Sequence, residues 1–235
     1  MQSSDRERLQ DPSSKDFWDG DDPNLVNLVT HPFARKKYVL RHTQPIKDRL
    51  LTLQEGIRQL AHSANQLLTL ARADPTANIA GKNQPVDLNA IVSEVAAKFF
   101  DRALQSNIDL GVEAQPVTVH ADPSLLDDLL GNLVDNALKY TPQGGSVTVS
   151  AGRLNGKPFL AVEDTGPGIP EADRQRVRQR FYRLPNSPGH GSGLGLAIVD
   201  EIARLYGAAV SIGAAKQGTG TSVQVLFPDA GGAHN

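Results

Sequence analysis

Two asparagines and a lysine recur at helical spacing in the segment LLGNLVDNALKY, residues 129–140. Asn132 and Asn136 are four residues apart, so in a helix they share one face, and Lys139 follows within reach of it. An amide oxygen is a hard ligand suited to Mg²⁺, which keeps water and phosphate oxygens as its other ligands. The segment is a candidate magnesium and phosphate site. Taken alone, it is equally compatible with two surface asparagines on an amphipathic helix.

A second candidate lies in VEDTGPGIP, residues 162–170, where an apolar stretch runs into Asp164 and then into Gly166 and Gly168. Glycine lets the backbone approach a ligand closely. A buried carboxylate at the end of a strand can accept a hydrogen bond from an exocyclic amine such as that of adenine. The simpler interpretation is a Gly-Pro turn that follows a strand.

Two glycine-rich stretches follow, GHGSGLGL at residues 189–196 and GTGT at residues 218–221. The first leads into a predicted helix, and a helix N-terminus with exposed backbone N–H groups favours phosphate. No strand precedes it directly, so it is not a dinucleotide-binding fingerprint. The chain also has no G-x-x-x-x-G-K-[ST] stretch, which excludes a P-loop. The second stretch by itself indicates only a turn.

The elements that must position these residues alternate irregularly between helix and strand. Asp122 is a good N-cap and Pro123 suits the first helical position. The pattern favours an α+β sandwich, with a mixed or antiparallel sheet covered by helices. The predicted helices span residues 86–103, about 123–140 and about 194–206, and the predicted strands span 108–112, 117–120, 147–151, 159–162, 209–212 and 222–227.

Upstream, the chain has a different character. Residues 46–75 carry apolar side chains at alternating spacings of four and three, a heptad seam that packs a helix against a partner; these are Ile46, Leu50, Leu53, Ile57, Leu60, Ala64, Leu67 and Ala71. Folding of this stripe onto the following domain is the alternative. Residues 1–45 are expected to be poorly ordered or atypical, 76–85 a linker, 86–228 the main domain and 229–235 a loose tail.

Bulk properties fit a soluble protein with an ordinary core. The 235 residues are 39% hydrophobic and 21% charged, with a formal net charge of −2, so no global basic field favours nucleic acid. The absence of cysteine excludes disulfides and thiolate metal sites. No apolar run is long enough to span a membrane, and the first residues lack the apolar core of a signal peptide. A cytoplasmic location is expected.

Together, the motifs resemble the catalytic ATP-binding domain of bacterial sensor histidine kinases of two-component systems, in the GHKL superfamily. In that resemblance the N box is residues 132–140, the first glycine box 164–168, the F box 180–183, the second glycine box 191–196 and the third 218–221. The resemblance implies ATP and Mg²⁺ as cofactors and a GHKL-type sandwich over residues 86–228. Residues 46–75 are similar to the second helix of the family's dimerisation and phosphotransfer hairpin.

The resemblance also implies roles for individual residues. Asn132, Lys139 and Arg183 would be catalytic, with Arg183 near the γ-phosphate, and Asn136 would hold Mg²⁺. The other nucleotide contacts would come from Tyr140, Asp164, Gly166, Gly168, Phe181, Gly191, Ser192, Gly193, Leu194, Gly195 and Thr221. Of these, Asp164 would bind the adenine amino group, and residues 184–191 would form a mobile lid.

The type of residue at position 132 distinguishes the members of the superfamily. The ATP-hydrolysing gyrase-, Hsp90- and MutL-like proteins place a glutamate there to activate water, and an amide cannot accept that proton. Asn132 therefore favours a protein-histidine kinase. The implied partners are ATP, a second chain through residues 46–73 in a homodimer or heterodimer, and a response regulator or a histidine-bearing phosphotransfer domain.

Two features depart from the family pattern. The phosphoacceptor box H-[E/Q]-L-R-T-P is missing, so the acceptor is unknown and His42 is a weak candidate. An ATP-binding dimerisation module without kinase activity, or a GHKL protein-serine kinase, therefore stays an alternative. Arg178 occupies a position that is usually apolar in the family, and it is expected to loosen the packing of the lid.

Overall fold

The computed structural model describes residues 83–185, 192–216 and 218–229, and upstream of them residues 49, 50, 53, 56, 64, 66, 68 and 69. The chain divides into two compact units, residues 1–60 and 61–235. In the first unit, the described residues are helical, and Leu50 and Leu53, two positions of the predicted seam, are 54% and 62% exposed. This exposure agrees with a stripe that needs a partner helix. Most other seam positions lie outside the described residues.

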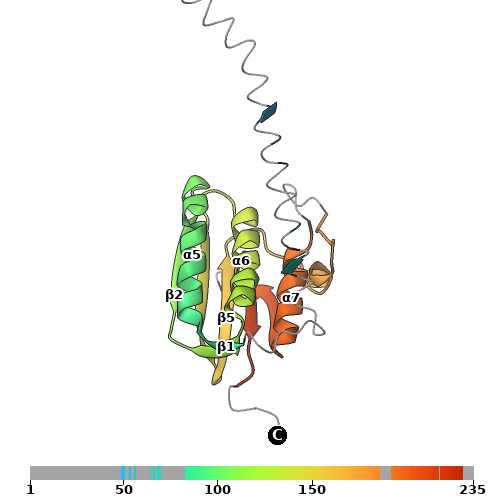
Figure 1. Ribbon diagram of the computed structural model, residues 1–235. Coiled ribbons are helices and arrows are strands. Elements are labelled where there is room, and N and C mark those ends of the chain that lie inside the picture. Colours follow the sequence, from blue (N-terminus) through green and yellow to red (C-terminus); the bar gives the residue numbers. More distant parts are fainter. Residues whose placement is uncertain are drawn as a thin grey trace, which may run out of the picture. The chain divides into compact units, whose positions relative to one another are not determined.

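The second unit is built around a five-stranded sheet in the order β2-β4-β5-β7-β6. Strands β2 and β4 are parallel, and every other neighbouring pair is antiparallel. Figure 1 shows the three helices side by side over one face of this sheet. The strands are β2 (Asp109–Ala114), β4 (Ser146–Leu154), β5 (Lys157–Asp164), β6 (Ala209–Ala214) and β7 (Thr221–Leu226), and the helices are α5 (Leu88–Gln105), α6 (Pro123–Tyr140) and α7 (Gly195–Leu205).

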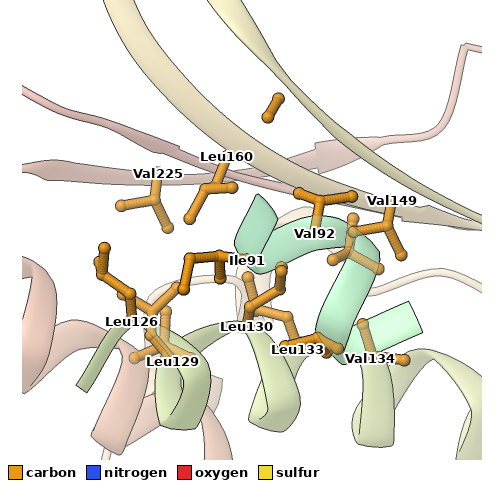
Figure 2. Close-up of a cluster of buried hydrophobic side chains, with 14 of the residues drawn as sticks. Ile91, Val92, Leu126, Leu129, Leu130, Leu133, Val134, Val149, Leu160 and Val225 are labelled. Atoms are coloured by element: carbon orange, nitrogen blue, oxygen red, sulfur yellow. The ribbon is translucent and has the colours of Figure 1, made fainter. Parts of the chain in front are cut away.

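The core lies between the helices and the sheet. Figure 2 shows leucines of α6 packed against residues of α5 and of the central strands. Along β4, Val147, Val149 and Ala151 are buried and alternate with the half-buried Thr148 and Ser150, as expected for a strand with one covered face. The predicted α+β sandwich with a mixed sheet is therefore confirmed.

The helix starts follow from local chemistry. Asp122 accepts a hydrogen bond from the backbone N–H of Ser124 at 2.8 Å, and Pro123 opens α6 as predicted. Asp87 caps α5 in the same way, through the N–H of Asn89 at 3.0 Å. The helix predicted from Val86 therefore begins two residues later, at Leu88.

A small separate sheet corrects the prediction further. Strand β1 (Gln84–Asp87) pairs antiparallel with β3 (Thr118–Ala121). Residues 84 and 85, predicted as the end of a linker, thus form part of a strand, and residues 76–82 lie outside the described part of the chain. The predicted turn between β4 and β5 is confirmed, because Asn155 and Gly156 adopt positive φ angles of 51° and 83°.

Leu130 gives a direct test of the α6 core, because its side chain is fully buried. We expect Leu130→Ala to lower the free energy of unfolding by about 2–5 kcal/mol, since the substitution removes buried methyl groups and leaves a cavity. Urea denaturation followed by circular dichroism measures this change. Leu154→Ala is the matched control, because Leu154 is 41% exposed and should lose less than about 1 kcal/mol. Equal losses in both variants would contradict the described core.

Candidate nucleotide site

The site is built on α6, whose opposite faces have different tasks. Leu129, Leu130 and Leu133 are buried, while Asn132, Asn136 and Lys139 are only half-buried on the other face. The helix ends at Tyr140, and the hydroxyl of Thr141 donates to the carbonyl of Ala137 at 2.7 Å. The two amides and the lysine therefore lie along one ridge, as their spacing predicts.

The two asparagines differ in how much of their amide is already engaged. Asn132 Nδ2 donates to the carbonyl oxygen of Asp128 at 2.7 Å, and within the unit of residues 61–235 its Oδ1 accepts from Gln66 Nε2 at 2.9 Å. The side chain of Asn136 makes no hydrogen bond to any residue in the described ranges. Asn136 is therefore the amide whose oxygen is available to a cation, which agrees with its predicted role.

Helix α7 begins directly against these amides. A β-carbon at Gly195 would lie 2.9 Å from Asn136 Nδ2 and 3.4 Å from Asn132 Oδ1. Only glycine lets the first turn of α7 approach α6 so closely. The positive end of the α7 dipole and the free amide of Asn136 thus face the same space, an arrangement suited to a cation-bound polyphosphate.

The site is electropositive beside this contact. Burial lowers the pKa of Lys139, and the nearby Arg183 guanidinium lowers it further, while Asp135 acts in the opposite direction. An anion beside these two cations would favour the charged form of Lys139. Lys139 Nζ also lies 5.4 Å from the centre of the Tyr140 ring. This grouping of Lys139, Tyr140 and Arg183 fits a phosphate chain.

Asp164 ends β5 in a buried position, 8% exposed. Its Oδ1 accepts from the backbone N–H of Gly166 at 2.8 Å and from that of Thr221 at 3.2 Å. Burial raises the pKa of Asp164 above its ordinary value, although these hydrogen bonds lower it in part. Two backbone donors therefore hold Oδ1, and the Thr221 side chain also hydrogen-bonds to the carboxylate.

Glycines bring three backbone segments together around Asp164. A β-carbon at Gly166 would lie 2.8 Å from the carbonyl oxygen of Tyr140, and one at Gly168 would lie 3.0 Å from that of Gly220. At Gly220, where φ is +108°, it would lie 1.8 Å from the carbonyl oxygen of Asp164. The first and third glycine boxes are therefore in direct contact. Side chains at these positions would push β5, β7 and the end of α6 apart.

The F box lies where the chain leaves for the lid. Phe181 is 69% exposed with φ of 66°, and its backbone N–H donates to the carbonyl of Gly193 at 2.9 Å. This bond joins the two segments that flank the predicted lid, residues 184–191. Ser192 Oγ accepts from the N–H of Leu194 at 3.2 Å, just before α7. Gly191 and His42, with most of the lid, lie outside the described residues.

Three supporting residues were missed by the sequence reasoning. Thr165 Oγ1 accepts from the N–H of Ser146 at 2.8 Å, which ties the loop after α6 to the first glycine box. Gly145 fits beneath it, since a β-carbon there would lie 2.7 Å from Thr165 Oγ1. Gln66, which also accepts from Ser192 Oγ at 2.6 Å, was a third omission. A hydroxyl directly after Asp164 was the only sequence signal for Thr165.

The comparisons with known proteins agree with this geometry. Residues 121–231 match the family model described as histidine kinase-, DNA gyrase B- and HSP90-like ATPase. The chain is 35% identical to the sensor protein kinase PmrB of Pseudomonas aeruginosa over 87% of this chain and 42% of that protein. The mycobacterial sensor histidine kinase MprB is 35% identical, with a TM-score of 0.56 over 62% of this chain and 97% of that structure.

This chain belongs to the sensor histidine kinases. It spans less than half the length of the curated relatives that it matches. A further solved relative, full-length ShkA in complex with AMPPNP, is 30% identical with a TM-score of 0.64 over 77% of this chain and 38% of that one. Among the helices that the structure describes, none is long and apolar enough to cross a membrane.

The side chains near Asn136 limit the kind of cation that this site could hold. In the described ranges, no group of three or more histidine, cysteine, aspartate or glutamate side chains could hold a metal ion. The residues fit a Mg²⁺ that is carried in by the nucleotide, with Asn136 as the protein ligand and phosphate oxygens and water as the others.

Gly195→Ala tests the contact between α7 and the amides of this histidine kinase. The added methyl group would displace the Asn136 side chain, so we expect Mg²⁺-dependent ATP affinity to fall by about tenfold or more. Isothermal titration calorimetry with a non-hydrolysable ATP analogue measures the loss. The control is Gly213→Ala, because a β-carbon at Gly213 meets nothing within 4 Å. Unchanged affinity in the first variant would contradict the close approach.

Asp164→Asn tests the base-binding carboxylate. The amide presents a donor in place of an acceptor to the adenine amino group, so we expect ATP affinity to fall about tenfold to a hundredfold. The preference for ATP over GTP should shrink as well, because the guanine carbonyl can accept from the amide. Competition with unlabelled nucleotides measures both, and Glu163→Gln is the control for a carboxylate on the same strand. An unchanged preference would remove Asp164 from base recognition.

The same variant has a predicted stability profile. Because the pKa of Asp164 is raised in the folded state, the folded protein binds this proton more tightly than the unfolded chain does. The stabilising contribution of protonated Asp164 to the free energy of unfolding is present at low pH, and it is lost as the pH rises through the folded-state pKa. We therefore expect Asp164→Asn to be at least as stable as the parent protein at neutral pH, and its relative stability to decline on acidification.

Proposed function

We propose that this chain is the ATP- and Mg²⁺-dependent catalytic part of a protein-histidine kinase. The observation that carries the proposal is the pairing of two amides on α6 with the start of α7. Asn132 occupies the position where a hydrolase needs a carboxylate, and its amide is held at both ends by Asp128 and Gln66. It cannot activate water, so the bound triphosphate is left for an incoming side chain.

The chain's own residues would contribute positioning and charge. Asn136 would hold Mg²⁺, which supplies charge neutralisation at the phosphates, Lys139 and Arg183 would neutralise further charge on the phosphate chain, and Asp164 would orient the base. In the transfer, the bond between the γ-phosphorus and the β,γ-bridging oxygen breaks, and a bond from the γ-phosphorus to a histidine ring nitrogen forms. ADP leaves with the bonding electron pair. Such a transfer needs little covalent chemistry from the protein.

The partners follow from the same proposal. Residues 1–235 contain no acceptor box, so the proposal places the acceptor histidine on a phosphotransfer domain outside them. A second chain packs against residues 46–73 in a homodimer or heterodimer, and a response regulator receives the phosphoryl group afterwards. The protein acts in the cytoplasm. The missing box also favours a second candidate, an ATP-binding dimerisation module without transfer activity.

Labelled phosphate transfer separates these candidates. The chain is incubated with γ-labelled ATP and Mg²⁺, first alone and then with a dimerisation domain that carries an intact acceptor box. We expect label on the added domain, in an acid-labile and base-stable form typical of phosphohistidine. Base-labile, acid-stable label would indicate a serine kinase, and bound ATP without any transfer would indicate the binding module.

Asn136→Ala makes the experiment specific to the site. We expect this variant to lose the Mg²⁺-dependent part of its ATP affinity, by about tenfold to a hundredfold, because it lacks the free amide oxygen. Transfer should fall with it. Asn89→Ala, on the remote first turn of α5, is the matched control. Normal Mg²⁺-dependent affinity in Asn136→Ala would contradict the assignment of the cation ligand.

A further inference from the structure

One ion pair joins the two segments that border the lid. Arg178 ends the short helix η2 (Arg176–Arg178), three residues before Phe181, and Asp200 lies on α7, five residues after Gly195. Arg178 Nε donates to Asp200 Oδ1 at 3.0 Å, and Nη2 donates to the same oxygen. Their side chains are 36% and 33% exposed, so solvent screens the pair only in part.

This pair gives Arg178 a partner that the sequence did not reveal, while its expected effect on the packing of the lid stays a prediction. A cation in place of an apolar residue was expected to loosen the packing, but the guanidinium has a specific acceptor on the facing helix. The preceding residue, Val177, is 9% exposed and packs η2 inward. An apolar side chain at this position would let η2 slide along α7, whereas two guanidinium donors on one carboxylate oxygen restrict the orientation of the contact. The substitution therefore fixes the orientation of η2 relative to α7.

The pair acts on the same helix that carries Gly195. One end of α7 lies against the amides of Asn132 and Asn136, and Asp200 lies in the middle of the helix. The chain that leaves η2 reaches Phe181, whose N–H is bonded to Gly193, and then Arg183. The position of Arg183 relative to the amide of Asn136, the proposed Mg²⁺ ligand, therefore depends on how η2 packs against α7.

We propose that Arg178 and Asp200 are positioning residues that hold the F box, and Arg183 with it, against the start of α7, and so set the affinity for the triphosphate of ATP. They do not touch the nucleotide. The inference rests on the proposed ATP site, and it assigns to this chain a charged coupling between the two borders of the lid. The inference adds to the proposed function that this ion pair affects binding of the triphosphate and not binding of the adenosine.

Charge reversal tests the coupling. We expect Arg178→Glu and Asp200→Arg each to weaken binding of Mg²⁺-ATP by about fivefold, the order expected for a partly exposed ion pair. AMP affinity should stay within about twofold, because AMP lacks the γ-phosphate that Arg183 would approach. The double variant Arg178→Glu/Asp200→Arg should recover most of the ATP affinity. Calorimetric titration at low and high ionic strength measures these changes, and salt should weaken the effect.

The control is Arg204→Glu, which reverses the 61% exposed charge of the neighbouring Glu201–Arg204 pair on α7 and should leave both affinities unchanged. Equal losses of ATP and AMP affinity, or no recovery in the double variant, would overturn the proposal. If a reversal variant fails to fold, as judged by thermal unfolding, Arg178→Lys replaces it, with an expected loss of about twofold. A chain that binds ATP normally but transfers no phosphate would contradict only the kinase proposal.

Discussion

The close approach of α7 to α6 at Gly195 is the contact on which the site depends. Here a helix N-terminus meets two amides within van der Waals distance, and a single methyl group would separate them. The approach is possible because α6 is held in place by its leucines, which are fully buried between the helix and the sheet. The hydrophobic core and the nucleotide site are thus two faces of one helix, and neither can shift without the other.

The sheet supplies the second fixed point. Asp164 lies at the end of β5, and its carboxylate is held by backbone N–H groups from two glycine boxes that are far apart in sequence. The proposed base-binding group therefore lies at the end of a strand, while Asn136 and Lys139, proposed to bind the cation and the phosphates, lie on a helix. Binding of a whole nucleotide requires both layers to keep their spacing. Thr165 contributes to this spacing because it ties the loop after α6 to the end of β5.

Much of this arrangement could be predicted from the sequence, because its signals are local. Asn132, Asn136 and Lys139 lie within one helix, and a helical period places them on one face without knowledge of the fold. Asp122-Pro123 and Asn155-Gly156 likewise specify a helix start and a turn by themselves. The parts that could not be predicted depend on long-range pairing. Strand β1 is recognisable only once β3 lies beside it, and Arg178 looked disruptive because its acceptor is 22 residues away across the lid.

The depressed basicity of Lys139 has a consequence for the thermodynamics of binding. A buried ammonium beside a guanidinium gives up its proton more readily than a solvated one, and an arriving polyphosphate reverses that tendency. At alkaline pH, where Lys139 begins to lose its proton, nucleotide binding at the proposed site would therefore be linked to proton uptake from the solvent. The measured heat of association then includes the ionisation heat of the buffer. The binding equilibrium then includes the proton that Lys139 takes up, besides the protein and the nucleotide.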